Sequence, residues 1–242
     1  CFDGGCAFTG WINSTYDIAN AGSYVLRFGV TNFSDTGYQS GMAFSGITVG
    51  GVAVSPGATR TGGAISIANV QTGKFTAAAG TSLTSGIIDS DGSITIDAGG
   101  PITTNDLVAG DFVDMTSDGN IGFANALAGT EFDFDAGGSV TGGNITAGAT
   151  IEGEVGGTVS LGNLVAGFAP GGFVDDDNFS VGIVAAGSTS VGNVQAAQAI
   201  GFGTFGNLAT GNLSAGNLVM TLVDGDITTG SIATTGAGGQ VY

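Results

Sequence analysis

The sequence predicts an all-β protein whose main part is a parallel β-helix, or β-solenoid, built from coils of 19 residues. Segments of that length beginning at Gly110, Gly129 and Gly148 can be written one above another. Short stretches alternate between apolar and polar residues, as at 132–135 (FDFD), and such alternation is typical of strands. Glycine recurs at the same places in each segment, which indicates tight corners between two or three strands per coil.

The aligned segments agree in chemistry, column by column. One column is apolar and a second is asparagine, with the members Val113, Phe132 and Ile151, and Asn125, Asn144 and Asn163. Stacked asparagines can hydrogen-bond amide to amide along the axis and tolerate left-handed backbone. The asparagine column is therefore predicted to be a structural ladder.

Three regions follow from the repeat. The regular array is expected over residues 92–242, with units opening at Gly92, Gly110, Gly129, Gly148, Gly167 and Gly187. Residues 59–91 are interpreted as looser transition coils. Residues 1–58 hold long alternating runs and turn formers, and they predict a small antiparallel β unit that resembles an incomplete sandwich.

The charge balance excludes several classes of partner. The chain has 20 acidic residues, 3 Lys and Arg and no histidine, and residues 75–242 carry 17 of the acids and no base. Nucleic acid is excluded, because binding to phosphates depends on Lys and Arg. No apolar run reaches the roughly 20 residues that cross a bilayer, so a membrane-spanning protein is not expected.

Cys1 and Cys6 are the only cysteines. An even count in a chain with secreted features predicts a small disulfide loop. Two free or lipid-modified thiols are the alternative.

Acidic residues also stack, and calcium is the one cofactor that they make conceivable. Asp114, Asp133 and Glu152 share a column, where like charges repel and an oxygen-seeking cation would relieve them. A solvated acidic face that keeps molecules apart is the alternative. The loop residues Asp175, Asp176 and Asp177 are the local candidate for a metal site.

An enzyme is not expected. Without histidine there can be no histidine-based triad or histidine metal site, and the array lacks the cations that a polysaccharide lyase needs. Acid pairs are plentiful, but Trp11, the sole tryptophan, lies outside the array and offers no sugar platform there.

Two stretches resemble exported bacterial proteins. Residues 21–49 (AGSYVLRFGVTNFSDTGYQSGMAFSGITV) resemble the closing strands of β-sandwich modules in such proteins. Over about residues 92–236, the 19-residue period with Gly-Asn-aliphatic-x-Ala/Thr-Gly at one corner is similar to the repeats of filamentous-haemagglutinin-like adhesins. That resemblance implies a right-handed helix and an extracellular adhesive or structural role, although the family's secretion domain is not recognisable.

The carboxy-terminal stretch suggests how such a rod could act. After Asp226 the chain reads ITTGSIATTGAGGQVY, without charge, proline or a helical pattern, so the last coil looks uncapped. The favoured hypothesis is a secreted, cell-surface filament whose subunits pair head to tail. A fragment of a larger adhesin is the alternative, and a calcium- or carbohydrate-binding module that recognises surface glycans is a more remote one.

Overall fold

The computed structural model describes residues 48–49, 52–53, 62–167, 179–236 and 238–242. These residues form strands and turns and no helix, so the part described contains no helical segment that could span a membrane. The predicted antiparallel unit lies almost wholly outside the described residues, as do Cys1 and Cys6. From its range the structure describes only β1 (Thr48–Val49) paired antiparallel with β2 (Val52–Ala53).

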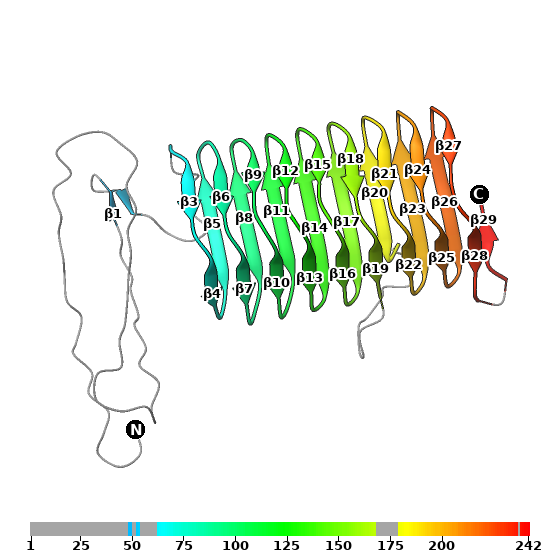
Figure 1. Cartoon of the computed structure of the whole chain (residues 1–242), viewed down its shortest axis with the longest axis horizontal. Coiled ribbons are helices and arrows are strands. Elements are labelled where there is room, and N and C mark those ends of the chain that lie inside the picture. Colours follow the sequence, from blue (N-terminus) through cyan, green and yellow to red (C-terminus); the bar gives the residue numbers. More distant parts are fainter. Residues whose placement is uncertain (1–47, 50–51, 54–61, 168–178, 237) are drawn as a thin grey trace, which may run out of the picture. The chain divides into compact units, whose positions relative to one another are not determined.

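The rest of the described chain is a parallel β-solenoid made of three nine-stranded sheets (Figure 1). Sheet C contains β3 (Ile65–Ile67), β6 (Leu83–Ser85), β9 (Ile102–Thr103), β12 (Ile121–Gly122), β15 (Val140–Thr141), β18 (Val159–Leu161), β21 (Thr189–Val191), β24 (Leu208–Thr210) and β27 (Ile227–Thr228). Sheet D contains β4 (Val70–Thr72), β7 (Ile88–Ser90), β10 (Leu107–Ala109), β13 (Ala126–Ala128), β16 (Ile145–Ala147), β19 (Leu164–Ala166), β22 (Val194–Ala196), β25 (Leu213–Ala215) and β28 (Ile232–Thr234). Sheet B contains β5 (Phe75–Ala79), β8 (Ile94–Ala98), β11 (Val113–Ser117), β14 (Glu131–Ala136), β17 (Thr150–Val155), β20 (Val181–Ala185), β23 (Ala199–Thr204), β26 (Leu218–Val223) and β29 (Gln240–Val241).

Each coil runs through one strand of sheet C, one of sheet D and one of sheet B, and each strand pairs in parallel with its equivalents in the neighbouring coils. The prediction of a parallel β-solenoid with 19-residue coils is confirmed, since Val113 pairs with Phe132 and Phe132 with Ile151. Neighbouring strands in such a sheet lie about 4.8 Å apart, so equivalent residues of successive coils form columns along the axis.

The register differs from the predicted one at two places. Regular coils already begin at Ile65, which pairs with Leu83, within the range interpreted as looser transition coils. Gly187 does not open a unit in the series of Gly148 and Gly167. Its N–H donates to the carbonyl of Gly157, at the corner after sheet B. The difference arises because Ile151 pairs with Val181, so this coil is 30 residues long instead of 19 and its extra length includes residues 168–178, which the structure does not describe.

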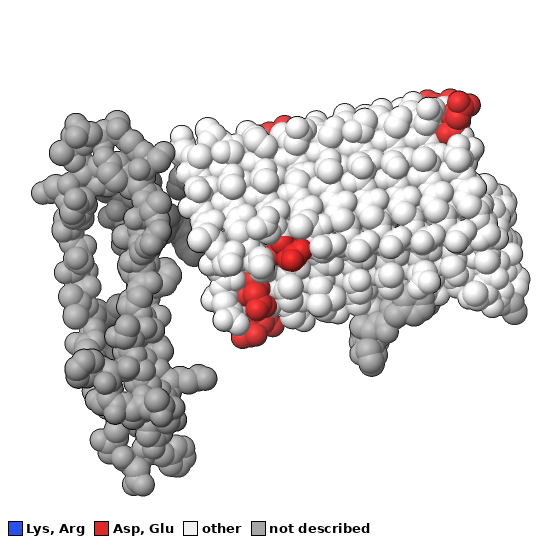
Figure 2. All heavy atoms as spheres, viewed as in Figure 1, with Lys and Arg blue, Asp and Glu red and all other residues white. Residues whose placement is uncertain are grey.

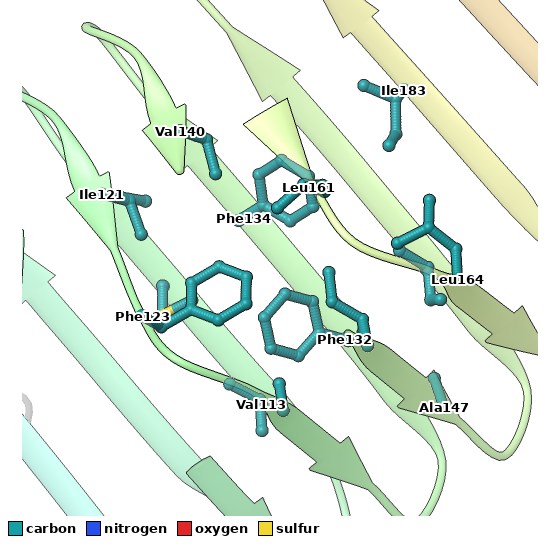
Figure 3. Packing of buried hydrophobic residues seen from close by; sticks show 14 of the residues in the cluster. Val113, Ile121, Phe123, Phe132, Phe134, Val140, Ala147, Leu161, Leu164 and Ile183 are labelled. Carbon is teal, nitrogen blue, oxygen red and sulfur yellow. The ribbon is translucent and has the colours of Figure 1, made fainter. Parts of the chain in front are cut away.

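Three phenylalanines are grouped in the core. Phe132 and Phe134 of β14 are both fully buried, and their ring centroids are 5.9 Å apart. Phe123 lies 5.4 Å from the ring of Phe132, with the rings tilted by 56° (Figure 3). Such tilted contacts add to the stabilisation from burial alone. The alternation read from the sequence places these side chains inward and Asp133 and Asp135 outward.

At two places in the core a glycine makes room for a phenylalanine of the preceding coil. Phe134 pairs with Gly153 in the next coil, and a Cβ built at Gly153 would overlap the Phe134 ring. Gly142 makes the same room for the ring of Phe123. The rings of Phe134 and Phe123 are therefore each accommodated by a glycine in the next coil.

We expect Gly153→Ala to lower the free energy of unfolding by about 1–3 kcal/mol, because overpacking forces the ring or the backbone to shift. Phe134→Leu in the same chain should recover part of the loss, and the coupling can be measured by chemical denaturation of the four chains of a double-mutant cycle. Gly203→Ala is the matched control, since a Cβ there would meet only the methyls of Val184, the nearest at 3.5 Å. Additive effects, or no loss in Gly153→Ala, would contradict this account.

Candidate functional site

The predicted asparagine column is a continuous ladder at the corner between sheets C and D. The side-chain oxygen of Asn125 accepts a hydrogen bond from the backbone N–H of Asn144 at 3.0 Å, and Asn144 accepts from Asn163 at 2.8 Å. The bonds therefore run from backbone to side chain, and not amide to amide as the sequence suggested. The ladder continues through Asn193 and Asn212, including across the 30-residue coil.

A second ladder, which sequence reasoning missed, stands at the corner between sheets B and C. Asn120 accepts from the N–H of Ser139 at 2.8 Å, and the Ser139 hydroxyl accepts from the N–H of Thr158 at 3.1 Å. Further along, Asn207 accepts from the N–H of Asp226. The acceptors in this column are amide and hydroxyl side chains, which share only an oxygen acceptor. Identity of residue type therefore could not reveal it, whereas the 19-residue spacing of acceptors could.

The ladders explain why glycine precedes so many of these asparagines. A Cβ built at Gly162 would lie 2.6 Å from the side-chain oxygen of Asn144, and one at Gly192 would lie 2.6 Å from that of Asn163. At the second corner, a Cβ at Gly157 would lie 2.5 Å from the hydroxyl oxygen of Ser139. Each acceptor leans over the glycine of the next coil, so the recurrent Gly-Asn pair is a packing requirement.

The outer face of sheet B holds the candidate metal-binding acids of the array. Asp114, Asp133 and Glu152 are adjacent in one column, as the sequence predicted. A second column on the same face brings Asp135 beside Glu154. Within the described residues no three acids, cysteines or histidines are grouped so that they could hold a metal ion. The candidate loop Asp175, Asp176 and Asp177 lies outside the described residues.

This acidic column alters the protonation of its members. Partial burial, followed by the charges of Asp114, Glu152 and Glu131, raises the pKa of Asp133 to about 6, although the side chain stays solvent-exposed. A hydrogen bond with the backbone of Phe134 acts in the opposite direction. Burial, followed by the charge of Asp97, raises the pKa of Asp114. Burial, followed by the charge of Glu131, raises that of Glu152. Each carboxylate is thus held in its charged form at neutral pH at some cost to the fold.

Charge is distributed unevenly over the molecule. The face seen in Figure 2 carries carboxylates at only a few places, and most of its surface is uncharged. Seven acids project instead from four neighbouring strands of sheet B: Asp97, Asp114, Glu131, Asp133, Asp135, Glu152 and Glu154. These seven residues form the acidic half of sheet B.

The last described coil leaves its core residues uncovered. Ile227, Ile232 and Val241 pair with residues whose side chains are buried, yet they are themselves 50%, 38% and 52% exposed. Their strands β27, β28 and β29 stand at the edge of their sheets and have a neighbour on one side only. Among the described residues, this coil therefore offers an unpaired edge and an apolar surface together.

Removing one rung should weaken the first ladder. Asn144→Ala deletes the acceptor for the N–H of Asn163, and we expect a loss of about 1 kcal/mol in the free energy of unfolding. Asn144→Asp keeps an oxygen at this position and should lose less, because Asp106 of the same column accepts from the N–H of Asn125 at 3.1 Å. Chemical denaturation measures both, and equal midpoints for all three chains would show that the rung contributes nothing.

The acidic column predicts a pH dependence of stability. Because the folded pKa of Asp133 is about 6 and the ordinary value is 3.8, the folded state binds more protons between these values. The free energy of unfolding should therefore rise as the pH falls from 7 to about 4, below which this carboxyl adds nothing further.

Asp133→Asn should flatten this pH dependence. It should also raise the melting temperature at pH 7, by an amount that corresponds to about 0.5 kcal/mol in the free energy of unfolding once solvent screening is taken into account. Asp91→Asn, at an exposed corner away from the column, is the control and should keep the slope of the parent. Thermal melts at several pH values decide the matter, and an unchanged slope in Asp133→Asn would count against the assignment.

Comparison of the chain with protein-family models, with curated proteins and with solved structures found no match. The resemblances to exported β-sandwich modules and to β-helical adhesins therefore stay predictions. Evidence on function comes from the three features described above: the corner ladders, the acidic half of sheet B and the uncovered last coil.

Proposed function

We propose that this chain is an extracellular structural protein whose subunits join head to tail, by β-strand pairing, into a surface filament. The observation that carries the proposal is the last coil, where apolar core residues and unpaired strand edges are exposed together. An exposed edge of this kind is a template for pairing with another chain.

The first described coil has the matching geometry. Its strands β3, β4 and β5 are the opposite edges of the same three sheets. Continuing the sheets into a second copy would set Ile227 against Ile65, Ile232 against Val70, and Val241 against Phe75. Ile65 and Val70 are only partly buried, so this stacking would cover apolar surface on both copies.

The corner ladder supports the same register. In the described residues its column begins at Asn69, whose side-chain oxygen accepts from the N–H of Ile87, and it ends at Ser231. A second copy stacked in register would place the backbone of its Asn69 over the Ser231 hydroxyl. The contact is heterologous, with different surfaces on the two copies, and repeating it produces a fibre and not a closed ring.

An extracellular location is part of the proposal and is supported by the sequence alone. It follows from the two resemblances to exported proteins and from the predicted disulfide between Cys1 and Cys6.

Electron microscopy of negatively stained protein at micromolar concentration tests the assembly. We expect fibres from the parent chain and their loss in Ile232→Asp, because a carboxylate on the covered surface would have to be buried without a partner. Ala233→Asp is the matched control, since its side chain lies on the outer side of the same strand and fibres should persist.

Both variants change only the last coil, so their melting temperatures should stay close to that of the parent. Single particles of the parent, without fibres, would overturn the proposal. Fibres from Ile232→Asp would show that assembly uses another surface.

A further inference from the structure

The outer face of sheet B changes character midway along the solenoid. One column of outward residues reads Asp97, Thr116, Asp135, Glu154, Val184, Gly203 and Leu222 in successive coils. Its neighbouring column changes likewise, from Asp114, Asp133 and Glu152 to Gly182, Gly201 and Met220. The acidic half is thus followed by an apolar half, defined here by Val184, Gly203, Met220, Leu222 and the corner residue Phe205.

The apolar half is open to solvent where its large side chains stand. Leu222 is 77% exposed, Phe205 70% and Val184 53%. Gly203 forms a depression between Val184 and Leu222, because it has no side chain. At Gly201 the face is already covered, since a Cβ there would lie 2.9 Å from the ring of Phe179. The open surface therefore follows the column of Val184, Gly203 and Leu222. Exposed apolar patches of this kind mark contact sites.

We infer that the apolar half of sheet B binds the same surface of a second copy of this chain, with the two solenoids antiparallel and β23 facing β23 across a two-fold axis. This lateral contact is separate from the head-to-tail contact proposed above and does not depend on it.

The charge distribution identifies the occupant as a second copy. An anionic membrane surface would lie over the acidic half as well as the apolar half and would be repelled by its carboxylates, whereas a second copy that runs in the opposite direction keeps the acidic strands out of the contact. A basic protein would be drawn to the acidic half and away from the apolar one. A second copy presents the same apolar surface and brings no charge into its centre. Glu154 and Asp224, which flank Val184 and Leu222, would lie at the rim of the contact.

The same distribution sets the orientation. Parallel solenoids stacked on this face would oppose the seven acids of one copy with the same seven acids of the other. In the antiparallel arrangement about β23, β20 faces β26 of the second copy, and none of the acidic strands β8, β11, β14 and β17 faces another of them. Val184 then meets Leu222 of the second copy, Gly203 lies near the axis, and the two copies of Phe205 approach each other.

The contact is small. Three strands spaced by about 4.8 Å, with about five residues each, present roughly 240 Å² per copy, well below the ~800 Å² of a standard interface. The pair is therefore expected to be weak and to form at high protein concentration.

Cross-linking detects such a weak pair. Packed sheets lie about 10 Å apart, beyond the reach of a disulfide, so a short bismaleimide is used as the probe. Gly203→Cys is sterically tolerated, because the nearest atom to a Cβ there is a methyl of Val184 at 3.5 Å. We expect a covalent dimer from Gly203→Cys and none above the background of the parent chain, which has only Cys1 and Cys6, from Thr116→Cys in the acidic half.

Two further arms test orientation and surface. A mixture of Val184→Cys and Leu222→Cys chains should give a mixed dimer, whereas Val184→Cys alone should give none. Leu222→Asp introduced into Gly203→Cys should abolish the dimer, and Leu127→Asp, at an exposed residue of sheet D, should leave it unchanged.

All chains also carry Ile232→Asp, which removes the head-to-tail contact, so that failure of one contact is not read as failure of the other. No dimer from Gly203→Cys would overturn the inference. A dimer from Thr116→Cys as strong as that from Gly203→Cys would show parallel stacking and overturn the antiparallel arrangement.

Discussion

Every feature of this solenoid depends on parallel backbone pairing between successive coils. A strand that slips by one residue turns its core side chains outward, so the 19-residue register has to hold in all three sheets at once. Extra residues are tolerated where they leave that register intact. The 30-residue coil meets this condition, because its additional length comes between β19 and β20, at a corner, and the strands on both sides still pair with their equivalents.

The same pairing places similar residues of successive coils beside one another, and the effect on stability depends on the residue type. For the hydrogen-bond acceptors at the corners repetition is favourable. The side chain of each coil accepts a hydrogen bond from a backbone N–H of the next coil, which the turn would otherwise leave without a partner. For Asp114, Asp133 and Glu152 it is costly, because three carboxylates of one sign are held at the spacing of the strands. For Phe134 repetition in the next coil is excluded by the size of the ring, and Gly153 in that coil supplies the space.

A stack built by repetition has no intrinsic end and has faces that extend over several coils. The proposed interactions with other molecules use the end of the stack and one of these faces. The last described coil exposes strand edges and core residues together, which favours addition of a further coil. The outer face of sheet B changes from acidic to apolar along the axis, which favours contact between copies that run in opposite directions. Longitudinal growth and lateral pairing therefore use different surfaces of one coil architecture.

The sequence by itself determined the period, the strand alternation and the asparagine column, because these follow from spacing along the chain. It placed Phe132 and Phe134 inside and Asp133 outside, as the structure does. Only the tertiary structure decided which residues are neighbours across coils. It showed that Asn120, Ser139 and Thr158 form one ladder, that Gly187 belongs to a different corner from Gly167, and that acids and apolar residues divide the face of sheet B. Side chains of different type can serve as the same hydrogen-bond acceptor, and an inserted loop shifts the apparent spacing. Residue identity alone therefore does not predict which residues of successive coils are neighbours.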